Sequence, residues 1–291
     1  MISRPWAAAL PLLLACAAPA SAGNTVAALS SGSAAYLEAF SAFQTAYGAA
    51  VPYYDISQKK ADIPTGTRTI VAFGGRAANQ AYDPGINLIY CMAPGFFAKS
   101  NSPETKKVKI SMVPEFRLLF DKLLAIQPGL KRLRVFWMVP DFETYTEAVK
   151  TEGTRHGVEV TTVRVESADD VPSLLRKGLP KMDAFWIPPD PLIISPETLM
   201  ILREFSWSNG VPFYGSTKGM TREGAAASVG VSFGEMGKAA AAVARLLDGG
   251  QAVPDMVFPE NVEITLNSSA ARKCGLTFPR AVIEEAGQIF P

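Results

Sequence analysis

The chain has 291 residues, with 28 Lys and Arg against 27 Asp and Glu, a formal net charge of +1 and 48% hydrophobic residues. A net charge so close to zero does not indicate a basic surface for binding nucleic acid. The composition is that of a packed globular protein rather than a disordered one. The part that follows the first segment, about 270 residues, is long for a single core and suits two lobes of roughly 100 to 150 residues each.

The first segment, residues 1–22, is predicted to direct export and to be removed. Arg4 supplies a small positive region, residues 6–18 are apolar, and residues 20–22 (Ala-Ser-Ala) form a small-residue cleavage site. The apolar run is shorter than the about 20 residues that a membrane span needs. An alternative stays open, because residues 13–16 (Leu-Leu-Ala-Cys) are typical of a lipobox in which Cys16 would be acylated.

Two cysteines follow this segment, Cys91 and Cys274. Export would permit a disulfide between them, but their sequence separation says nothing about their distance in space. We expect two buried free thiols, because an unpaired cysteine commonly packs as a small apolar side chain.

Short β-branched and aromatic runs alternate with helical patterns along the chain, which is typical of parallel sheets built from strand–helix units. The expected strands cover residues 25–29, 51–55, 69–73, 86–92, 133–139, 158–165, 184–188, 211–214 and 228–232. The expected helices cover residues 113–128, 141–156, 196–209 and 236–247. Two doubly wound α/β lobes are therefore predicted, and right-handed connections would place the loops after the strands at one edge of each sheet.

These loops supply the candidate ligand-binding residues. They hold several aromatic side chains and few charges, and the members of interest are Phe96, Phe97, Asp141, Phe142, Tyr145 and Asp190. Such a lining suits a mostly apolar ligand that a few polar groups orient. Two readings of Asp190 stay open, ligand contact and capping of a helix, because it stands in a proline-rich turn. Gly74 and Gly75 either let a backbone approach a ligand or form a plain tight turn.

One catalytic motif is present, the sequence Gly-Val-Ser-Phe-Gly at residues 230–234, which fits a nucleophile elbow with Ser232 as the nucleophile. The chain's one histidine, His156, precedes this serine, whereas that fold orders its triad Ser, then Asp or Glu, then His. A serine hydrolase is therefore the minor alternative. No metal-ligand spacing, Walker sequence or dinucleotide fingerprint occurs, so we expect no enzyme, no metal and no cofactor.

Several segments together carry a family resemblance. They are residues 131–136 (KRLRVF), 182–190 (MDAFWIPPD), 209–215 (NGVPFYG), 230–237 (GVSFGEMG), Leu266 with Asn267, and 274–279 (CGLTFP). In these the chain resembles the ABC-transporter substrate-binding proteins related to tryptophan- and tyrosine-binding lipoproteins, which have the type I periplasmic-binding-protein fold. The resemblance covers most of the chain after the first segment and is strongest from about Leu130 onward.

The resemblance implies a monomeric periplasmic protein that closes two lobes over a small apolar or amphipathic ligand and delivers it to an inner-membrane permease. The chain would cross between the lobes three times, with residues 23–110 and 233–252 in the first lobe and residues 111–232 and 253–291 in the second. The family's pocket would map onto loop residues of both lobes. These are Ser30, Ser31, Gly74, Gly75, Asp190 and Ser216.

One departure from the family pattern bears on the ligand. Only residues 57–68 separate the second expected strand from the third, too few for the usual helix and strand approach. The first lobe should therefore lack a helix on one side. This favours a lipid-like molecule slightly over an aromatic amino acid, while a ligand sensor or scaffold for a membrane receptor stays open as a further alternative.

Overall fold

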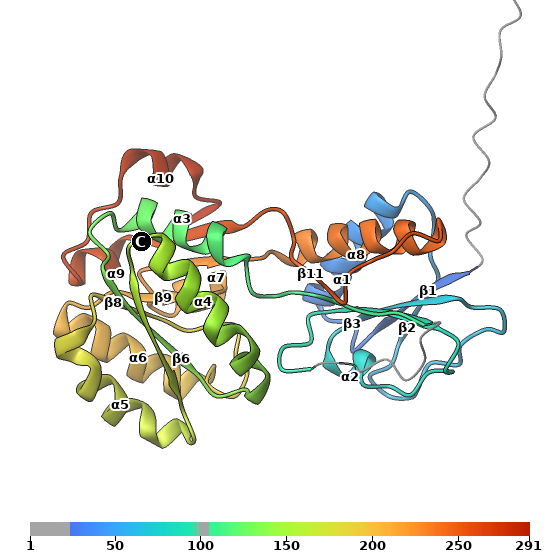
Figure 1. Ribbon diagram of the computed structural model, residues 1–291, viewed down its shortest axis with the longest axis horizontal. Helices are drawn as coiled ribbons and strands as arrows, with labels where there is room; N and C mark the ends of the chain where they lie inside the picture. The colour runs from blue at the N-terminus through green and yellow to red at the C-terminus, as the bar shows by residue number, and fades with distance from the viewer. Residues whose placement is uncertain (1–23, 97, 99–104) are drawn as a thin grey trace, which may run out of the picture.

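The computed structural model describes residues 24–96, 98 and 105–291 of the chain. The expected export segment, Cys16 and Phe97 lie outside these residues. Figure 1 shows two α/β lobes joined by extended crossing segments, so the predicted fold class is confirmed. None of the helices within the described residues is long and apolar enough to span a bilayer.

The first lobe is built on a six-stranded sheet in which every neighbouring pair of strands is parallel. Its strand order is β11-β5-β4-β3-β1-β2. The strands are β1 (Thr25–Leu29), β2 (Tyr53–Asp55), β3 (Thr69–Phe73), β4 (Asn87–Cys91), β5 (Lys107–Ile110) and β11 (Met256–Val257). Strands β1 and β3 are buried along their whole length, as expected for a sheet covered on both faces.

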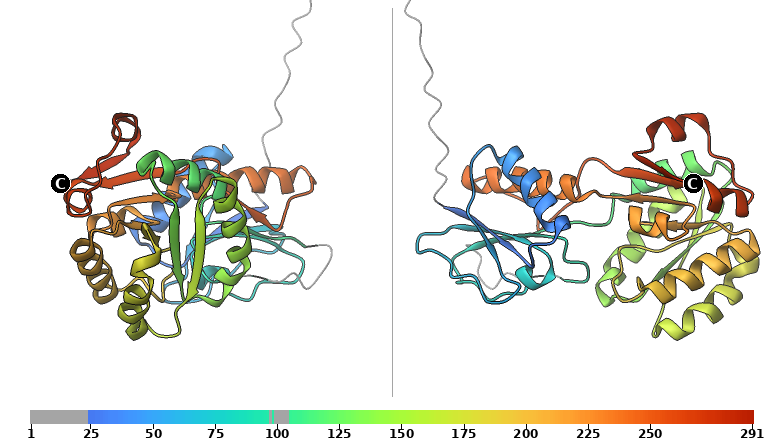
Figure 2. Two further views of the ribbon diagram at one scale, coloured as in Figure 1. Left: turned by 60° about the vertical axis from the view of Figure 1, so that its left-hand side comes forward. Right: turned by 180° about the vertical axis from the view of Figure 1, so that it is seen from behind.

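Two long helices cover one face of this sheet, α1 (Ala34–Tyr47) and α8 (Phe233–Asp248). They lie side by side in Figure 1 and again in both views of Figure 2. Phe43 of α1 and Ala240 of α8 are fully buried between the helices and the sheet. Burial of these apolar faces is the main stabilising term of the lobe.

The opposite face is covered by loops and by the four-residue helix α2 (Gly75–Ala78). Residues 56–68, between β2 and β3, are all described and contain no helix, which confirms the expected missing helix. A smaller apolar cluster on this face includes Val26, Ile70 and Tyr90 of the sheet, with Ile56 from the loop that replaces the helix.

The second lobe contains a seven-stranded sheet in the order β13-β12-β10-β9-β8-β6-β7. The strands are β6 (Arg132–Trp137), β7 (Glu159–Arg164), β8 (Ala184–Trp186), β9 (Phe213–Gly215), β10 (Ala227–Gly230), β12 (Glu263–Asn267) and β13 (Gln288–Phe290). Strands β6 to β10 run parallel to one another, whereas β12 is antiparallel to β10 and parallel to β13. The antiparallel strand follows from the chain's return from the first lobe.

Helices cover both faces of the second sheet. They are α3 (Phe116–Ile126), α4 (Glu143–Arg155), α5 (Val171–Gly178), α6 (Pro196–Asn209), α7 (Lys218–Arg222), α9 (Ser268–Lys273) and α10 (Arg280–Glu285). The start of α6 follows the sequence signal, because the Ser195 side chain accepts a hydrogen bond from the Thr198 N–H at 3.2 Å and Pro196 occupies the first turn.

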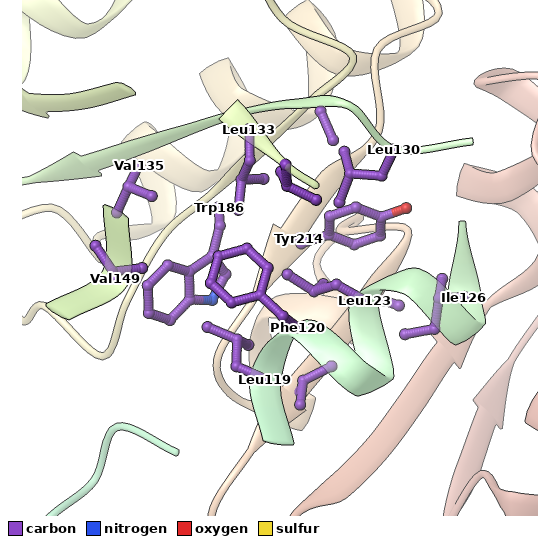
Figure 3. Packing of buried hydrophobic residues seen from close by; sticks show 14 of the residues in the cluster. Leu119, Phe120, Leu123, Ile126, Leu130, Leu133, Val135, Val149, Trp186 and Tyr214 are labelled. Carbon is purple, nitrogen blue, oxygen red and sulfur yellow. The ribbon is translucent and has the colours of Figure 1, made fainter. Parts of the chain in front are cut away.

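The core of the second lobe lies between α3 and the sheet (Figure 3). Trp186, Phe120 and Tyr214 are fully buried there. The Tyr214 hydroxyl donates to Oε1 of Gln127 at 2.7 Å, which satisfies its polar end within an apolar setting. This packed layer holds the carboxyl ends of β6, β8 and β9 in fixed positions, and the loops that follow them face the first lobe.

The chain passes between the lobes through residues 111–115, 231–232 and 258–262. The last passage differs from the expected boundary, which placed all of residues 253–291 in the second lobe. Met256 and Val257 of β11 pair with Lys109 and Ile110 of β5 in the first sheet. The expected boundary was wrong here because a two-residue edge strand carries no periodic pattern of its own and is fixed by its partner strand.

Candidate functional site

Two hollows lie where the lobes face each other. The first is here called the apolar hollow, and the space of about 400 Å³ around it includes open solvent. Its lining comes from both lobes and from the first passage between them: Pro94, Gly95, Lys109, Met112, Val113, Val139, Phe142, Tyr145, Pro188, Pro189 and Asp190. The second, here called the polar hollow, shares Met112 and Pro189 with the first, and the space of about 530 Å³ around it likewise includes open solvent. The two hollows are therefore adjoining parts of one cleft.

Aromatic rings form the second-lobe side of the apolar hollow. Phe142 lies in the short helical turn Pro140–Phe142 and Tyr145 in the first turn of α4, and their ring centroids are 5.5 Å apart. Behind them, Phe142 contacts the rings of Trp137 and Trp186 at centroid distances of 6.0 and 6.1 Å. The two residues thus project from a packed aromatic layer, which gives the hollow a rigid apolar wall.

The Asp190 carboxylate accepts hydrogen bonds from backbone N–H groups. It is 2% exposed, and its Oδ2 accepts hydrogen bonds from the N–H groups of Met138 and Val139 at 2.5 and 2.8 Å. Its Oδ1 accepts from the Leu192 N–H at 2.9 Å. These contacts are made to N–H groups of two loops rather than to the start of a helix, and they occupy three of the about four acceptor positions on the carboxylate.

The first-lobe side of the apolar hollow is formed by Pro94, Gly95 and Lys109. Gly95 approaches the second lobe so closely that a Cβ at this position would lie 2.5 Å from Cγ1 of Val139. Lys109 is 6% exposed, in the strand that leads into the first passage. The hollow therefore includes one cationic side chain in a lining that is otherwise mostly apolar.

The first-lobe loops that the family resemblance implicated lie outside both hollows. The Ser30 hydroxyl accepts a hydrogen bond from the Ala77 N–H at 2.9 Å and so holds the start of α2. Gly74 donates its N–H to the Cys91 carbonyl oxygen at 2.8 Å. Ser31 follows Ser30 and is half-buried, and Gly75 lines a separate hollow with Arg76. In this arrangement of the lobes these four residues are not brought to the cleft.

One further predicted position, Phe96, also lies away from the cleft. Phe96 packs edge-on against Tyr90, with centroids 5.4 Å apart, on the face of the first sheet that has no long helix. Asp141 occupies the turn Pro140–Phe142 beside the apolar hollow. Ser216, in contrast, lines the polar hollow and is 3% exposed. Phe142, Tyr145, Asp190 and Ser216 are therefore the predicted residues that the structure brings together.

The geometry around Ser232 opposes a catalytic role. The Ser232 hydroxyl caps α8 by accepting a hydrogen bond from the Glu235 N–H at 3.2 Å. His156 lies at the end of α4, where Nε2 is 3.1 Å from Oδ1 of Asp121 and Nδ1 is 2.9 Å from the carbonyl oxygen of Glu152. These two contacts engage both ring nitrogens of His156 within the second lobe, so the elements of a triad are not assembled.

The lining of the cleft includes residues that the sequence did not indicate. Met112 and Val113 belong to the first passage between the lobes, and Glu38, Glu263 and Thr265 line the polar hollow. These residues reach the cleft because of the way the two lobes are placed, which a local sequence pattern does not indicate. The one available signal was the end of an apolar strand at Ile110 followed by Pro114, which marks a change of direction.

Both cysteines in the described residues are free: Cys91 is buried in the first lobe, and Cys274 is half-buried in the second. Burial raises the pKa of the Cys91 thiol. No group of three or more His, Cys, Asp or Glu side chains within the described ranges is placed to hold a metal ion.

Two parallel-sheet lobes, three passages between them and a cleft lined from both sides define a ligand-binding protein of the periplasmic-binding-protein class. The chain belongs to the family described as ABC transporter substrate binding protein, which matches residues 119–290. Proteins of this family bind a substrate without converting it and act outside the cytoplasm as the partner of a permease. The enzyme alternative at Ser232 is thereby set aside.

Solved structures show the same fold at low identity. An ABC domain in complex with L-Trp from Streptococcus pneumonia has a TM-score of 0.59 and 18% identity, covering 92% of this chain and 100% of that chain. A ligand-free, open substrate binding protein with adhesive properties from Clostridium difficile has a TM-score of 0.66 and 16% identity, covering 92% and 99%. A glucose-galactose binding protein from Geobacillus stearothermophilus has a TM-score of 0.53 and 13% identity, covering 83% and 96%. A comparison with curated proteins found no match.

Proposed function

We propose that this chain is the periplasmic binding component of an ABC-type or related envelope transport system and that it carries a small, mostly apolar ligand between its lobes. The observation that carries this proposal is the apolar hollow, whose wall of Phe142 and Tyr145 faces Pro94 and Gly95 across the cleft. A concave, mostly apolar site with a few polar groups is the usual form of a small-molecule site.

A lipid-like ligand fits this site slightly better than an aromatic amino acid. An amino acid holds its ammonium directly beside its side chain, and the carboxylate that lines the apolar hollow, that of Asp190, already accepts three backbone hydrogen bonds, so an acceptor for the ammonium must lie farther away. The loop that replaces a helix between β2 and β3 also leaves the first lobe less enclosed. Both observations favour a ligand whose apolar part is larger than a single side chain.

The proposed mechanism is closure of the lobes about their passages. The passages at residues 111–115, 231–232 and 258–262 are short segments that can absorb the rotation. A ligand drives closure only to the extent that it binds the closed arrangement better than the open one. Residues 1–22 serve in this proposal as a cleavable export signal, with acylation of Cys16 as the alternative processing.

Native mass spectrometry of the gently purified protein tests the proposal. We expect a co-purified molecule of lipid-like mass, and a bound aromatic amino acid would contradict the preference for a lipid. The variant Met112→Gln places an amide between the two hollows and should lower the bound fraction about tenfold, because an apolar ligand cannot satisfy the buried amide. Met200→Gln is the matched control, since Met200 is 52% exposed on α6, and it should leave binding unchanged.

Scattering in solution tests the mechanism. The radius of gyration should fall when the ligand saturates the protein, because closure brings two lobes together. An unchanged radius in saturating ligand would contradict closure, while leaving the identity of the ligand to the mass measurement.

A further inference from the structure

The polar hollow carries an unbalanced pair of carboxylates, one from each lobe. Glu38 reaches it from α1 in the first lobe, and Glu263 from the start of β12 in the second. Among the residues that the structure describes, neither carboxylate forms a hydrogen bond or ion pair, and Oε1 of Glu263 lies beside Gly287, 3.0 Å from where a Cβ would stand. Lys218, an exposed residue at the start of α7, is the one cation in the described lining of this hollow.

The floor of the polar hollow adds hydrogen-bond acceptors. The Thr265 hydroxyl donates to the Thr221 hydroxyl at 2.8 Å, and the Ser228 and Thr265 oxygens are 2.7 Å apart. Because each hydroxyl has one hydrogen and that of Thr265 is committed to Thr221, Ser228 must donate to Thr265. Ser228, a lining residue of the hollow, thus keeps oxygen lone pairs that can accept a hydrogen bond.

Ser216 has the same character. Its hydroxyl donates to the Met220 sulfur at 3.6 Å, so the oxygen of this lining residue keeps lone pairs that can accept a hydrogen bond. The oxygens of Thr217 and Ser232 accept from the backbone N–H groups of Met220 and Glu235, so these bonds do not use the hydroxyl hydrogens. Counting charges and acceptors together, the hollow favours a group that donates hydrogen bonds and carries positive charge.

We propose that the ligand has a cationic amine head group that binds in the polar hollow while its apolar part occupies the apolar hollow. This inference rests on the proposed function and specifies its substrate class. The two hollows share Met112 and Pro189, so one molecule can occupy both. An ammonium between Glu38 and Glu263 also opposes the repulsion that two carboxylates on facing lobes would meet as the lobes close.

Isothermal titration with three octyl probes tests the proposal: octylamine, octanol and octanoate, at neutral pH and low salt. The three share one apolar chain and differ only in head-group charge. Octylamine should bind about tenfold more tightly than the other two, because a partly desolvated charge pair adds affinity that a neutral or anionic head lacks. Octanoate binding as tightly as octylamine would overturn the proposal.

Variants of the two glutamates test whether the preference for octylamine arises in the polar hollow. Glu263→Gln and Glu38→Gln should each reduce the preference for octylamine over octanol severalfold. Glu260→Gln is the matched control, because Glu260 is exposed in the same passage and lines neither hollow. An amine preference that survives in both Glu38 and Glu263 variants would overturn the assignment to the polar hollow.

The outcomes also separate this inference from the proposed function. Octanol and octanoate that bind in the cleft, with no advantage for octylamine, would overturn the amine and leave the apolar ligand standing. No binding by any of the three probes would overturn both. Octylamine that binds equally well to Met112→Gln would show that it binds outside the cleft, and this too would overturn the proposal.

Discussion

The carboxylate of Asp190 lies 2.8 Å from the backbone nitrogen of Val139 and joins the loop after β8 to the loop after β6. The same Oδ2 accepts from Met138, so one buried oxygen fixes the turn that carries Phe142 into the apolar hollow. The cleft wall therefore depends on a polar contact beneath it.

Replacement of Asp190 by Asn should destabilise the protein by about 2 kcal/mol, because the amide keeps only one acceptor oxygen and hydrogen bonds to a charged partner contribute about 1.5 to 3 kcal/mol. Urea denaturation measures the loss. Asp169→Asn, an exposed aspartate of the same lobe, should change stability by less than about 0.5 kcal/mol. Equal stability of the two variants would show that Asp190 contributes nothing through these contacts.

Replacement of Gly95 by Ala should push the lobes apart. Gly95 has φ +75, where an alanine costs about 1 to 2 kcal/mol, and its Cβ would lie 2.5 Å from Val139 in the other lobe. Scattering should give a larger radius of gyration without ligand. Gly250→Ala is the control that has the backbone strain without the contact with Val139, because Gly250 has φ +67 and nothing within 4 Å of the added carbon. A radius that rises in both variants would exclude the Val139 contact as the cause.

Much of the fold could be predicted because its strands are apolar throughout. Residues 69–73 (TIVAF) predict a strand covered on both faces, and β3 is buried along its length. The helix at 196–209 was marked by Ser195 and Gly210, and its bounds are those of α6. In such segments local propensity, capping and burial agree, so the sequence pattern alone is sufficient.

Other elements escaped prediction for identifiable reasons. Helix α1 (Ala34–Tyr47) is preceded by Ser33 and followed by Gly48, a signal that was present and not used. Strands β11 and β13 have two and three residues, too few to show an alternating pattern. The candidate site was harder still, since Met112 and Glu263 reach the cleft only because the lobes are placed as they are.

Replacement of Gly237 by Ala should loosen the helix pair of the first lobe. A Cβ at Gly237 of α8 would lie 2.0 Å from the Ala39 carbonyl oxygen and 2.9 Å from the Phe43 nitrogen, both backbone atoms of α1. Because backbone cannot move aside as a side chain can, the helices must separate, at a cost of about 3 kcal/mol. Thermal and urea unfolding both report this loss.

The control for Gly237 lies one turn earlier in the same helix. The added carbon of Gly234→Ala would have its nearest neighbours at 3.9 Å, an ordinary contact, so alanine should stabilise the helix by up to about 1 kcal/mol. Similar effects at both positions would contradict the close approach of α1 and α8.

The chain's single histidine should make stability depend on pH. The hydrogen bond to the Glu152 carbonyl oxygen, and then the contact with Asp121, hold the pKa of His156 above its usual value of 6.5, against the opposing effect of burial. A folded-state pKa above the unfolded one means that His156 stabilises the fold fully below pH 6.5. This contribution is lost as the pH rises through the folded-state pKa.

His156→Gln should therefore lower the free energy of unfolding more at about pH 5.5 than at about pH 8.5. We expect a difference of about 0.5 to 1 kcal/mol, as for an ion pair near the surface. Urea denaturation of the native protein and the variant at both pH values gives the difference. Asp121→Asn keeps the histidine but removes its carboxylate partner, so it should lower the pKa and shrink the pH-dependent part of the difference. A cost that is larger at the higher pH would mean that the neutral form of His156 is the one the fold stabilises.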